Sequence, residues 1–372
     1  MNRLIALLSI AASLPAADLL RFHEHTIATD LKGAYQVVVT DLNRDGKPDL
    51  LALASGMPDL LWFEGPGWTR HVLASGFRQM INCAAADTDG DGIPEIVLAH
   101  EFSMQAAKSL GIVSLLQHTG DPRAPWKVRE IDRIPTAHRI RVANGAFVNA
   151  PLAAADAAAP DYRGRTPLVL YRPGAWQRET ISTENEGVVH GIEVIDWDRD
   201  GREDILTASF GGIHLFRLGR DGRWTRSLLA AGDPAPWPKC GASDVTAGRL
   251  GRSRFLATIE PWHGNQVAVY RESGGAWRRT VIDSSLPDAH TIITADLDGD
   301  RRDEVVAGFR GQGRSVYIYR EQSGRWVRET LDAGGIAAAA CAAADLNGDR
   351  RTDIVCVGSA TANLKWYENI GK

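Results

Sequence analysis

The stretch from Asp196 to Ile205 reads DWDRDGREDI, and it decides the fold because close copies of it recur along the chain. Its pattern is D-x-[DN]-x-D-[GR]-x-x-[DE]-[ILV], an acidic turn followed by the start of an apolar strand. The other copies are DLNRDGKPDL from Asp41, DTDGDGIPEI from Asp87, DLDGDRRDEV from Asp296 and DLNGDRRTDI from Asp345. Such self-similarity, at a period of about fifty residues, indicates a fold built from repeats.

A second signature closes each unit, a strand that combines an aromatic residue with basic ones. It occurs as GWTRHVL at Gly67, WKVREI at Trp126, WQRETI at Trp176, RWTRSLL at Arg223, AWRRTVI at Ala276 and RWVRETL at Arg325. These segments also mark two units, around Asn144 and Gly248, that lack the acidic turn. Together the units predict short strands in blades of four, as in a β-propeller.

The two ends of the chain complete the count. A seventh closing strand, RFHEHTI, lies at Arg21 to Ile27, and the final segment LKWYENIGK is one strand short of a full unit. We therefore expect the N-terminal strand to pair with the last blade, which leaves no open sheet edge. The prediction is an all-β, seven-bladed propeller of four-stranded blades, closed by that strand and spanning residues 18–372.

Residues 1–17 have the composition of a signal peptide. A basic start precedes an apolar run from Leu4 to Leu14 and a small-residue stretch at Pro15 to Ala17. We expect export to the periplasm or the outside of the cell. No other apolar run approaches the roughly 20 residues that a membrane span needs, so no membrane insertion is expected. The net charge of -4 disfavours a nucleic-acid partner, and the oligomeric state is left open.

Four cysteines, Cys83, Cys240, Cys341 and Cys356, are too few for a disulfide framework in 372 residues. Cys341 and Cys356 could face each other across a hairpin. Because cross-strand geometry often strains a disulfide, buried free thiols are the favoured interpretation.

The acidic turns resemble the FG-GAP or VCBS repeats of integrin-like and bacterial secreted propellers. In such repeats the carboxylates either bind Ca²⁺ or hydrogen-bond the amides of their own turn, and both alternatives stay open. The full ligand pattern occurs in two turns, at Asp41, Asn43, Asp45 and Asp49 and at Asp196, Asp198, Asp200 and Asp204. Any Ca²⁺ there would be structural, since the distal Glu of a regulatory calcium loop is absent.

Three histidines share one position in the repeat. His138 lies six residues before Asn144, His190 six before Asp196, and His290 six before Asp296. This register is the start of the strand that lines the central channel, in blades three, four and six. Three converging imidazoles suit Zn²⁺ or a similar divalent transition metal. The alternative is a set of channel histidines hydrogen-bonded to one another or to water.

Other polar residues are expected at the same channel mouth. His100, Glu101, His263 and Arg310 follow second strands, and Tyr35 occupies the histidine register in the first blade. Two long loops, Glu101 to Leu110 and Asn149 to Pro167, are expected to wall the mouth, as functional loops on rigid scaffolds do. His100, Glu101 or His263 would be the catalytic base, Arg310 would bind an oxygen anion, and Trp262 would stack on a sugar.

Part of the sequence resembles the propeller domain of the aldos-2-ulose dehydratase family. The segments that carry the likeness are HRIRVAN at His138, NAPLAAADAAAPDY at Asn149, PLVLYRPGAW at Pro167 and VVHGIEVIDWDRDG at Val188. The resemblance implies zinc-dependent loss of water from a keto sugar, by β-elimination in a metal-centred pocket. Two alternatives remain, a polysaccharide or oligosaccharide lyase with the same pocket and a propeller that only binds glycan or protein.

Overall fold

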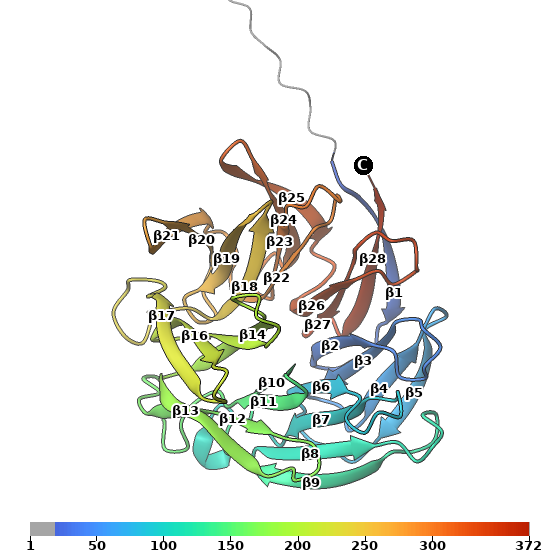
Figure 1. The fold of residues 1–372 in the computed structure, drawn as a ribbon. Helices are drawn as coiled ribbons and strands as arrows, with labels where there is room; N and C mark the ends of the chain where they lie inside the picture. Colours follow the sequence, from blue (N-terminus) through green and yellow to red (C-terminus); the bar gives the residue numbers. More distant parts are fainter. Residues whose placement is uncertain (1–18, 372) are drawn as a thin grey trace, which may run out of the picture.

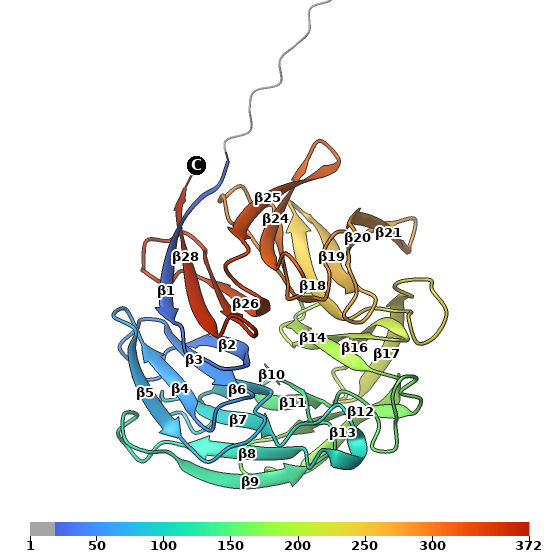
Figure 2. The same cartoon turned by 180° about the vertical axis from the view of Figure 1, so that it is seen from behind.

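The computed structural model describes residues 19–371, and its strands form seven antiparallel sheets of four strands each. Figures 1 and 2 show the sheets around a central axis, each with its first strand innermost. Six blades follow chain order from the inner to the outer strand. The expected signal peptide lies outside the described residues.

The strand bounds of the first three blades are as follows. Blade one holds β2 (Ala34–Thr40), β3 (Asp49–Ala54), β4 (Leu60–Glu64) and β5 (Thr69–Ala74). Blade two holds β6 (Asn82–Ala86), β7 (Glu95–His100), β8 (Ile112–Gln117) and β9 (Lys127–Arg133). Blade three holds β10 (Arg139–Ala143), β11 (Ala146–Ala150), β12 (Arg165–Tyr171) and β13 (Arg178–Glu186).

Three further blades repeat the same order. Blade four holds β14 (Val189–Ile195), β15 (Asp204–Ser209), β16 (Gly212–Leu218) and β17 (Trp224–Ala230). Blade five holds β18 (Asp244–Leu250), β19 (Ser253–Glu260), β20 (Gln266–Ser273) and β21 (Ala276–Asp283). Blade six holds β22 (Ala289–Ala295), β23 (Glu304–Phe309), β24 (Ser315–Gln322) and β25 (Arg325–Ala333).

The seventh blade confirms the predicted closure of the ring. It contains β26 (Ala338–Ala344), β27 (Asp353–Gly358) and β28 (Asn363–Gly371), and its outermost strand is β1 (Arg21–Ala28). β1 runs antiparallel to β28, and Figure 1 shows the two strands side by side. Every sheet therefore has four strands, as the repeat count predicted.

Each acidic turn joins the first strand of its blade to the second, which is an apolar run buried along its whole length, for example DLLALA in β3 and DIVCVG in β27. The last acid of the motif begins this buried strand. Asp49 accepts hydrogen bonds from the backbone N–H groups of Leu42 (2.9 Å) and Gly65 (2.7 Å), and Asp353 accepts equivalent bonds from Leu346 and Asn369. The carboxylate thus provides a hydrogen-bond acceptor for backbone amides at two places, the acidic turn itself and the end of the third strand.

Neighbouring blades are joined by a recurring polar contact. Asp132, near the end of β9, accepts a hydrogen bond from Tyr171 of blade three at 2.7 Å. It also forms an ion pair with Arg178 of the same blade as Tyr171. Asp283, at the end of β21, binds Tyr319 at 2.9 Å and Arg328 at 3.0 Å in blade six. Hydrogen bonds to a charged group contribute about 1.5–3 kcal/mol each, so these contacts help to hold the ring together.

The cysteines correct one expectation. Cys341 on β26 and Cys356 on β27 are direct cross-strand partners and form a disulfide, so the prediction of free thiols was wrong for this pair. The reason is the strand register, which places their Cα atoms 4.1 Å apart. Cys83 and Cys240 are free, as predicted, and burial raises the pKa of Cys83 to about 12.

The single helix in residues 19–371 is a short 3-10 turn, η1 (Ala106–Lys108), in the loop after β7. None of the helical segments in that range is long and apolar enough to cross a membrane.

Candidate functional site

A pocket of about 320 Å³ lies at one end of the central channel, and we call it the mouth pocket. Its lining comes from most blades, because the inner strands begin here and two long loops fold over it. The lining residues are Tyr35, Phe102, Met104, His138, Leu152, His190, Trp262, His263, Asp288 and Arg310. Phe102 and Met104 come from the loop after β7, and Leu152 from the loop after β11, so both predicted loops contribute to the wall. A volume of this size is typical of small-molecule sites.

Two imidazoles are fixed by backbone carbonyl groups. His190 is the second residue of β14 and His290 the second residue of β22. The Nδ1 atom of His190 lies 3.2 Å from the carbonyl oxygen of Ser243, and that of His290 lies 2.6 Å from the carbonyl oxygen of Ala339. Because a carbonyl oxygen can only accept, Nδ1 carries the proton in both rings. Each Nε2 therefore carries a lone pair that can bind a metal ion or accept a proton.

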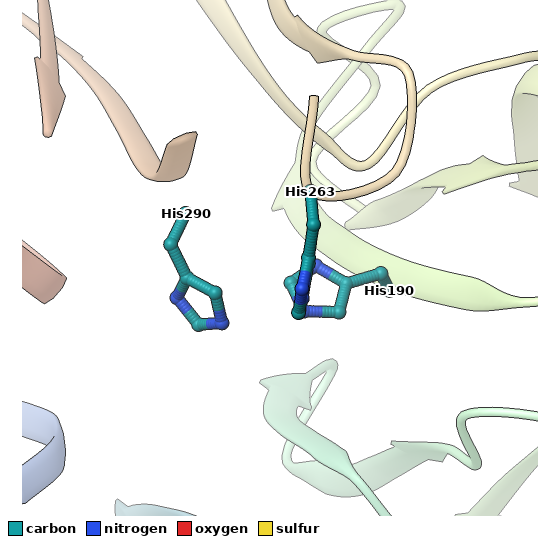
Figure 3. Close-up of side chains that lie close together, drawn as sticks. All are labelled: His190, His263 and His290. Atoms are coloured by element: carbon teal, nitrogen blue, oxygen red, sulfur yellow. The ribbon is translucent and has the colours of Figure 1, made fainter. Parts of the chain in front are cut away.

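His263 completes a group of three. It lies in the turn between β19 and β20, and its Nε2 is 3.4 Å from the Nε2 of His190. One ligand atom from each of His190, His263 and His290 can be chosen so that all three lie within 4.8 Å of one another. Figure 3 shows the three rings close together, with His263 descending from its loop beside His190 and His290 facing them from the other side. The predicted trio contained His138 in place of His263.

His138, which directly precedes β10, lies beside this group. Its ring centre is 5.1 Å from that of His190, but its Nε2 is 3.2 Å from the hydroxyl of Tyr35. The same hydroxyl is 3.2 Å from Nε2 of His290. The Nδ1 atom of His138 is buried and has no hydrogen-bond partner among the described residues. Tyr35 and His138 thus form a pair that can move a proton at the edge of the histidine group.

The imidazoles of the mouth pocket are neutral at physiological pH. Burial holds the pKa of His138, His190 and His290 well below the ordinary value of 6.5. Burial, together with the charge of Arg310, lowers the pKa of His263 to about 4. Burial also raises the pKa of Tyr35, which keeps it a phenol. Neutral imidazole is the form that binds metal ions and accepts protons.

Asp288 and Arg310 form an ion pair beside His263, and Asp288 was not among the predicted site residues. Arg310 donates to both carboxylate oxygens of Asp288, at 3.1 and 3.0 Å. One of those oxygens is 3.4 Å from Nδ1 of His263. Nη2 of Arg310 also lies 3.4 Å from this Nδ1 and competes with the carboxylate for it. When Nδ1 donates to the carboxylate, Nε2 of His263 presents a lone pair to the histidine group. Asp288 lies two residues before His290, and this position in the sequence is the signal that could have identified it.

The residues present fit a transition metal. Zn²⁺ takes imidazole nitrogens at about 2.0–2.1 Å, which places neighbouring donors of a tetrahedral site about 3.3 Å apart. The distance between the Nε2 atoms of His190 and His263 already matches this value, at 3.4 Å. Carbonyl or carboxylate partners on the Nδ1 atoms are the usual supports of metal-binding histidines. His190 and His290 have such supports, and the ring of His263 converges with them beside the carboxylate of Asp288.

Two predicted site residues, His100 and Glu101, do not line the mouth pocket. His100 ends β7, where its Nε2 lies 3.0 Å from the hydroxyl of Ser114 and its ring packs on Phe77. Glu101 forms an ion pair with Arg78 at 2.8 Å and lines a separate open pocket between blades one and two. His100 ends the second strand of its blade and Glu101 follows it, and a second strand lies one strand farther from the axis than the first.

The central channel itself holds charged groups that were not among the predicted site residues. Next to His290 is a cavity of about 450 Å³, with Arg139, Arg141, Glu193 and Asp244 in its wall. Burial raises the pKa of Asp244 to about 6 and that of Glu193 to about 7. Arg139 donates from Nε to the carbonyl oxygen of His190 at 2.7 Å, and thereby fixes the backbone that carries this histidine.

The acidic turns lie between first and second strands, at the other end of the strands from the mouth pocket. The predicted ligands in the first turn are Asp41, Asn43, Asp45 and Asp49, and there Asp41 accepts backbone N–H groups, including that of Gly46 at 2.8 Å. The group Asp196, Asp198 and Asp200 could hold a metal ion by proximity, although arginines pair with Asp198 and Asp200. Asp49 and Asp204 bind backbone amides of the fold instead.

Comparison with known proteins supports this architecture. Residues 110–273 match the family model described as the beta-propeller domain of aldos-2-ulose dehydratase, and residues 30–98 and 296–356 match FG-GAP-like repeats. Aldos-2-ulose dehydratase from Phanerodontia chrysosporium is 26% identical over an alignment of 266 residues, with coverage of 61% of this chain and 29% of that protein. The chain therefore spans less than a third of the curated relative that it matches.

A solved structure from Bacteroides uniformis ATCC 8492, of a candidate 6-phosphogluconolactonase, has a TM-score of 0.54 at 15% identity. The likeness covers 88% of this chain and 89% of the other, and it concerns the fold alone. The chain is thus a seven-bladed propeller with FG-GAP-like repeats, similar to the propeller domain of aldos-2-ulose dehydratase. His138, His190 and His263 lie inside the segment that matches this domain, whereas His290 lies outside both matched families.

Proposed function

We propose that this chain is a metal-dependent carbon–oxygen lyase that removes water from a keto sugar by β-elimination. The observation that carries the proposal is the convergence of neutral, carbonyl-supported imidazoles in the mouth pocket. Similarity to the propeller of a sugar dehydratase supports the substrate class. The signal-like composition of residues 1–17 supports a secreted enzyme.

His190, His263 and His290 would hold a divalent transition metal, with Zn²⁺ as the first candidate. When bound, such an ion polarises a carbonyl oxygen and stabilises the negative charge that develops there. His138 is then left free for proton transfer, in contrast to the ligand set expected from the repeat register.

The remaining residues perform the proton transfers and hold the sugar. The C–H bond next to the carbonyl breaks, and the Tyr35–His138 pair takes its proton. The electrons form the new C=C bond as the C–O bond at the β-carbon breaks, and the same pair returns the proton to the departing hydroxyl, which leaves as water. Arg310, held by Asp288, would bind the carbonyl or enolate oxygen, while Trp262 would face the sugar ring.

Two other functions use the same pocket. Loss of a sugar in place of water would make the chain an oligosaccharide lyase, and binding without turnover would make it a glycan-binding propeller. The conversion of a C–H and a C–O bond into a C=C bond conjugated with a carbonyl separates turnover from binding, because the product absorbs ultraviolet light.

The test uses tag-free protein, elemental analysis and a panel of keto sugars and uronate oligomers. We expect about one transition-metal ion per chain in the mouth pocket and a rise in ultraviolet absorbance with a keto sugar. His190→Ala and His263→Ala should lose that metal, whereas His138→Asn should keep it and lose turnover about 100-fold or more. Unchanged metal content in His190→Ala would contradict the metal site, and no absorbance with any sugar would favour the binding propeller.

A further inference from the structure

A second group of side chains of the types that bind metals lies where the ring closes, on the two outermost strands of blade seven. His23 and His25 are two residues apart on β1 and therefore lie on the same face of the strand. Their cross-strand partners on β28 are Glu368 and Trp366, respectively. We call His23, His25 and Glu368 the closure cluster.

The donor atoms of the closure cluster are close together. Nε2 of His25 is 2.8 Å from Oε2 of Glu368, and Nδ1 of His23 is 4.0 Å from the same oxygen. One donor atom from each residue lies within 4.8 Å of the other two. Two imidazoles and a carboxylate are the ligand types that Zn²⁺, Ni²⁺ and Cu²⁺ accept in proteins.

Neighbouring side chains hold two of the three ligands in place. The ring of His25 stacks on Trp366, with centres 4.4 Å apart and planes 18° apart. Asn347 donates to the second oxygen of Glu368 at 3.1 Å, which leaves Oε2 for the histidines. The side chain of His23 is 68% exposed, so it can rotate to complete a site that an ion enters directly from solvent. Such support of the ligands is typical of metal sites.

We propose that the closure cluster binds one divalent transition-metal ion, which fastens the N-terminal strand to β28. The register of β1 on β28 is broken at Arg21/Phe22 and at Thr26/Ala28, on either side of the segment that carries His23 and His25. A metal bound only by the folded ring stabilises it by mass action. The proposal does not depend on the chemistry of the mouth pocket.

The experiment measures Zn²⁺-dependent protection of the full, tag-free chain after chelator treatment. We expect excess Zn²⁺ to raise the melting temperature by about 2 °C and to slow amide exchange several-fold in β1. His23→Ala should abolish the slower exchange in β1, since His23 is exposed and its loss leaves the fold intact. Thr26→Ala, at another exposed position of the strand, and His190→Ala, in the mouth pocket, should both retain it.

Two results would overturn the proposal. One is an absence of any Zn²⁺ effect on exchange in β1 of the wild-type chain. The other is an effect of equal size in His23→Ala, which would assign the protection to another site. Protection confined to the strands of the mouth pocket would count against the closure cluster and leave the proposed function intact.

Discussion

Repeated polar residues have opposite roles on the two faces of the propeller, one with the acidic turns and the other with the mouth pocket. At each acidic turn, the first aspartate accepts hydrogen bonds from amides of its own turn, as Asp296 does from the N–H groups of Gly299 and Arg301. At the mouth pocket, imidazoles from different blades face one another, and His138 keeps a buried nitrogen without a protein partner among the described residues. The most often repeated motif therefore serves the fold, and the side chains that meet only after the ring forms are the candidates for chemistry.

The largest expected effect lies at the mouth pocket. Arg310→Gln removes the charge that we assign to the substrate oxygen, and we expect kcat/KM for the keto sugar to fall roughly 100-fold. Arg217→Gln is the matched control, because Arg217 pairs with Asp198 at an acidic turn and its side chain is half exposed. Steady-state kinetics on both variants provide the measurement. An equal loss of kcat/KM in Arg217→Gln would contradict the functional difference between the mouth pocket and the acidic turns.

A stability effect is expected at the turn face. Asp204 is buried and accepts the backbone N–H groups of Trp197 at 3.3 Å and Leu218 at 2.9 Å. Asp204→Asn replaces one accepting oxygen with a donor, so the free energy of unfolding should fall by about 1–3 kcal/mol. Asp198→Asn, at an exposed position of the same turn, should change it by less than about 0.5 kcal/mol. Urea unfolding measures both variants, and equal losses would contradict the role assigned to Asp204.

The smallest effect concerns pH and two histidines outside the mouth pocket. Burial lowers the pKa of His100 and of His214 to about 4 in the folded chain. Between pH 6.5 and 4 the unfolded chain therefore binds protons that the folded chain does not, and stability falls as pH falls. Each ring contributes up to about 1.4 kcal/mol per pH unit to this slope.

His214→Gln should flatten the slope by that amount, and His100→Gln should add to it, because the two rings lie in different blades. Denaturant unfolding between pH 7 and 5 provides the measurement. A slope that neither variant changes would show that both rings take up protons in the folded state.

The sequence predicted the ring well because strands, turns and closing segments repeat at a fixed spacing. The same spacing placed Tyr35, His138, His190 and His290 at the starts of inner strands, where the structure has them. Loop residues follow no such rule. His263 has a φ angle of 49°, and this left-handed turn directs its side chain in a way that no spacing predicts. Asp288, with a φ angle of 56°, is the exception, because it lies two residues before His290 in the repeat.

The misplaced candidates have a related cause. His100 is the last residue of β7, at the position that Phe309 holds in β23, whereas Arg310 follows its strand at the position of Glu101. Second strands stand about 4.8 Å farther from the axis than first strands. The long side chain of Arg310 spans that distance to the mouth pocket, whereas His100 hydrogen-bonds Ser114 of β8 and Glu101 pairs with Arg78.

The pairing of β1 with β28 also shapes how the chain folds. Contacts such as that of His23 with Glu368 join residues about as far apart in sequence as this chain allows. During synthesis, β1 emerges long before its partner exists, and blade seven keeps an open edge until β28 has been made. Contacts of such long range also slow folding. β1 thus leaves the ribosome before the other strands of the ring and is among the last to find its place.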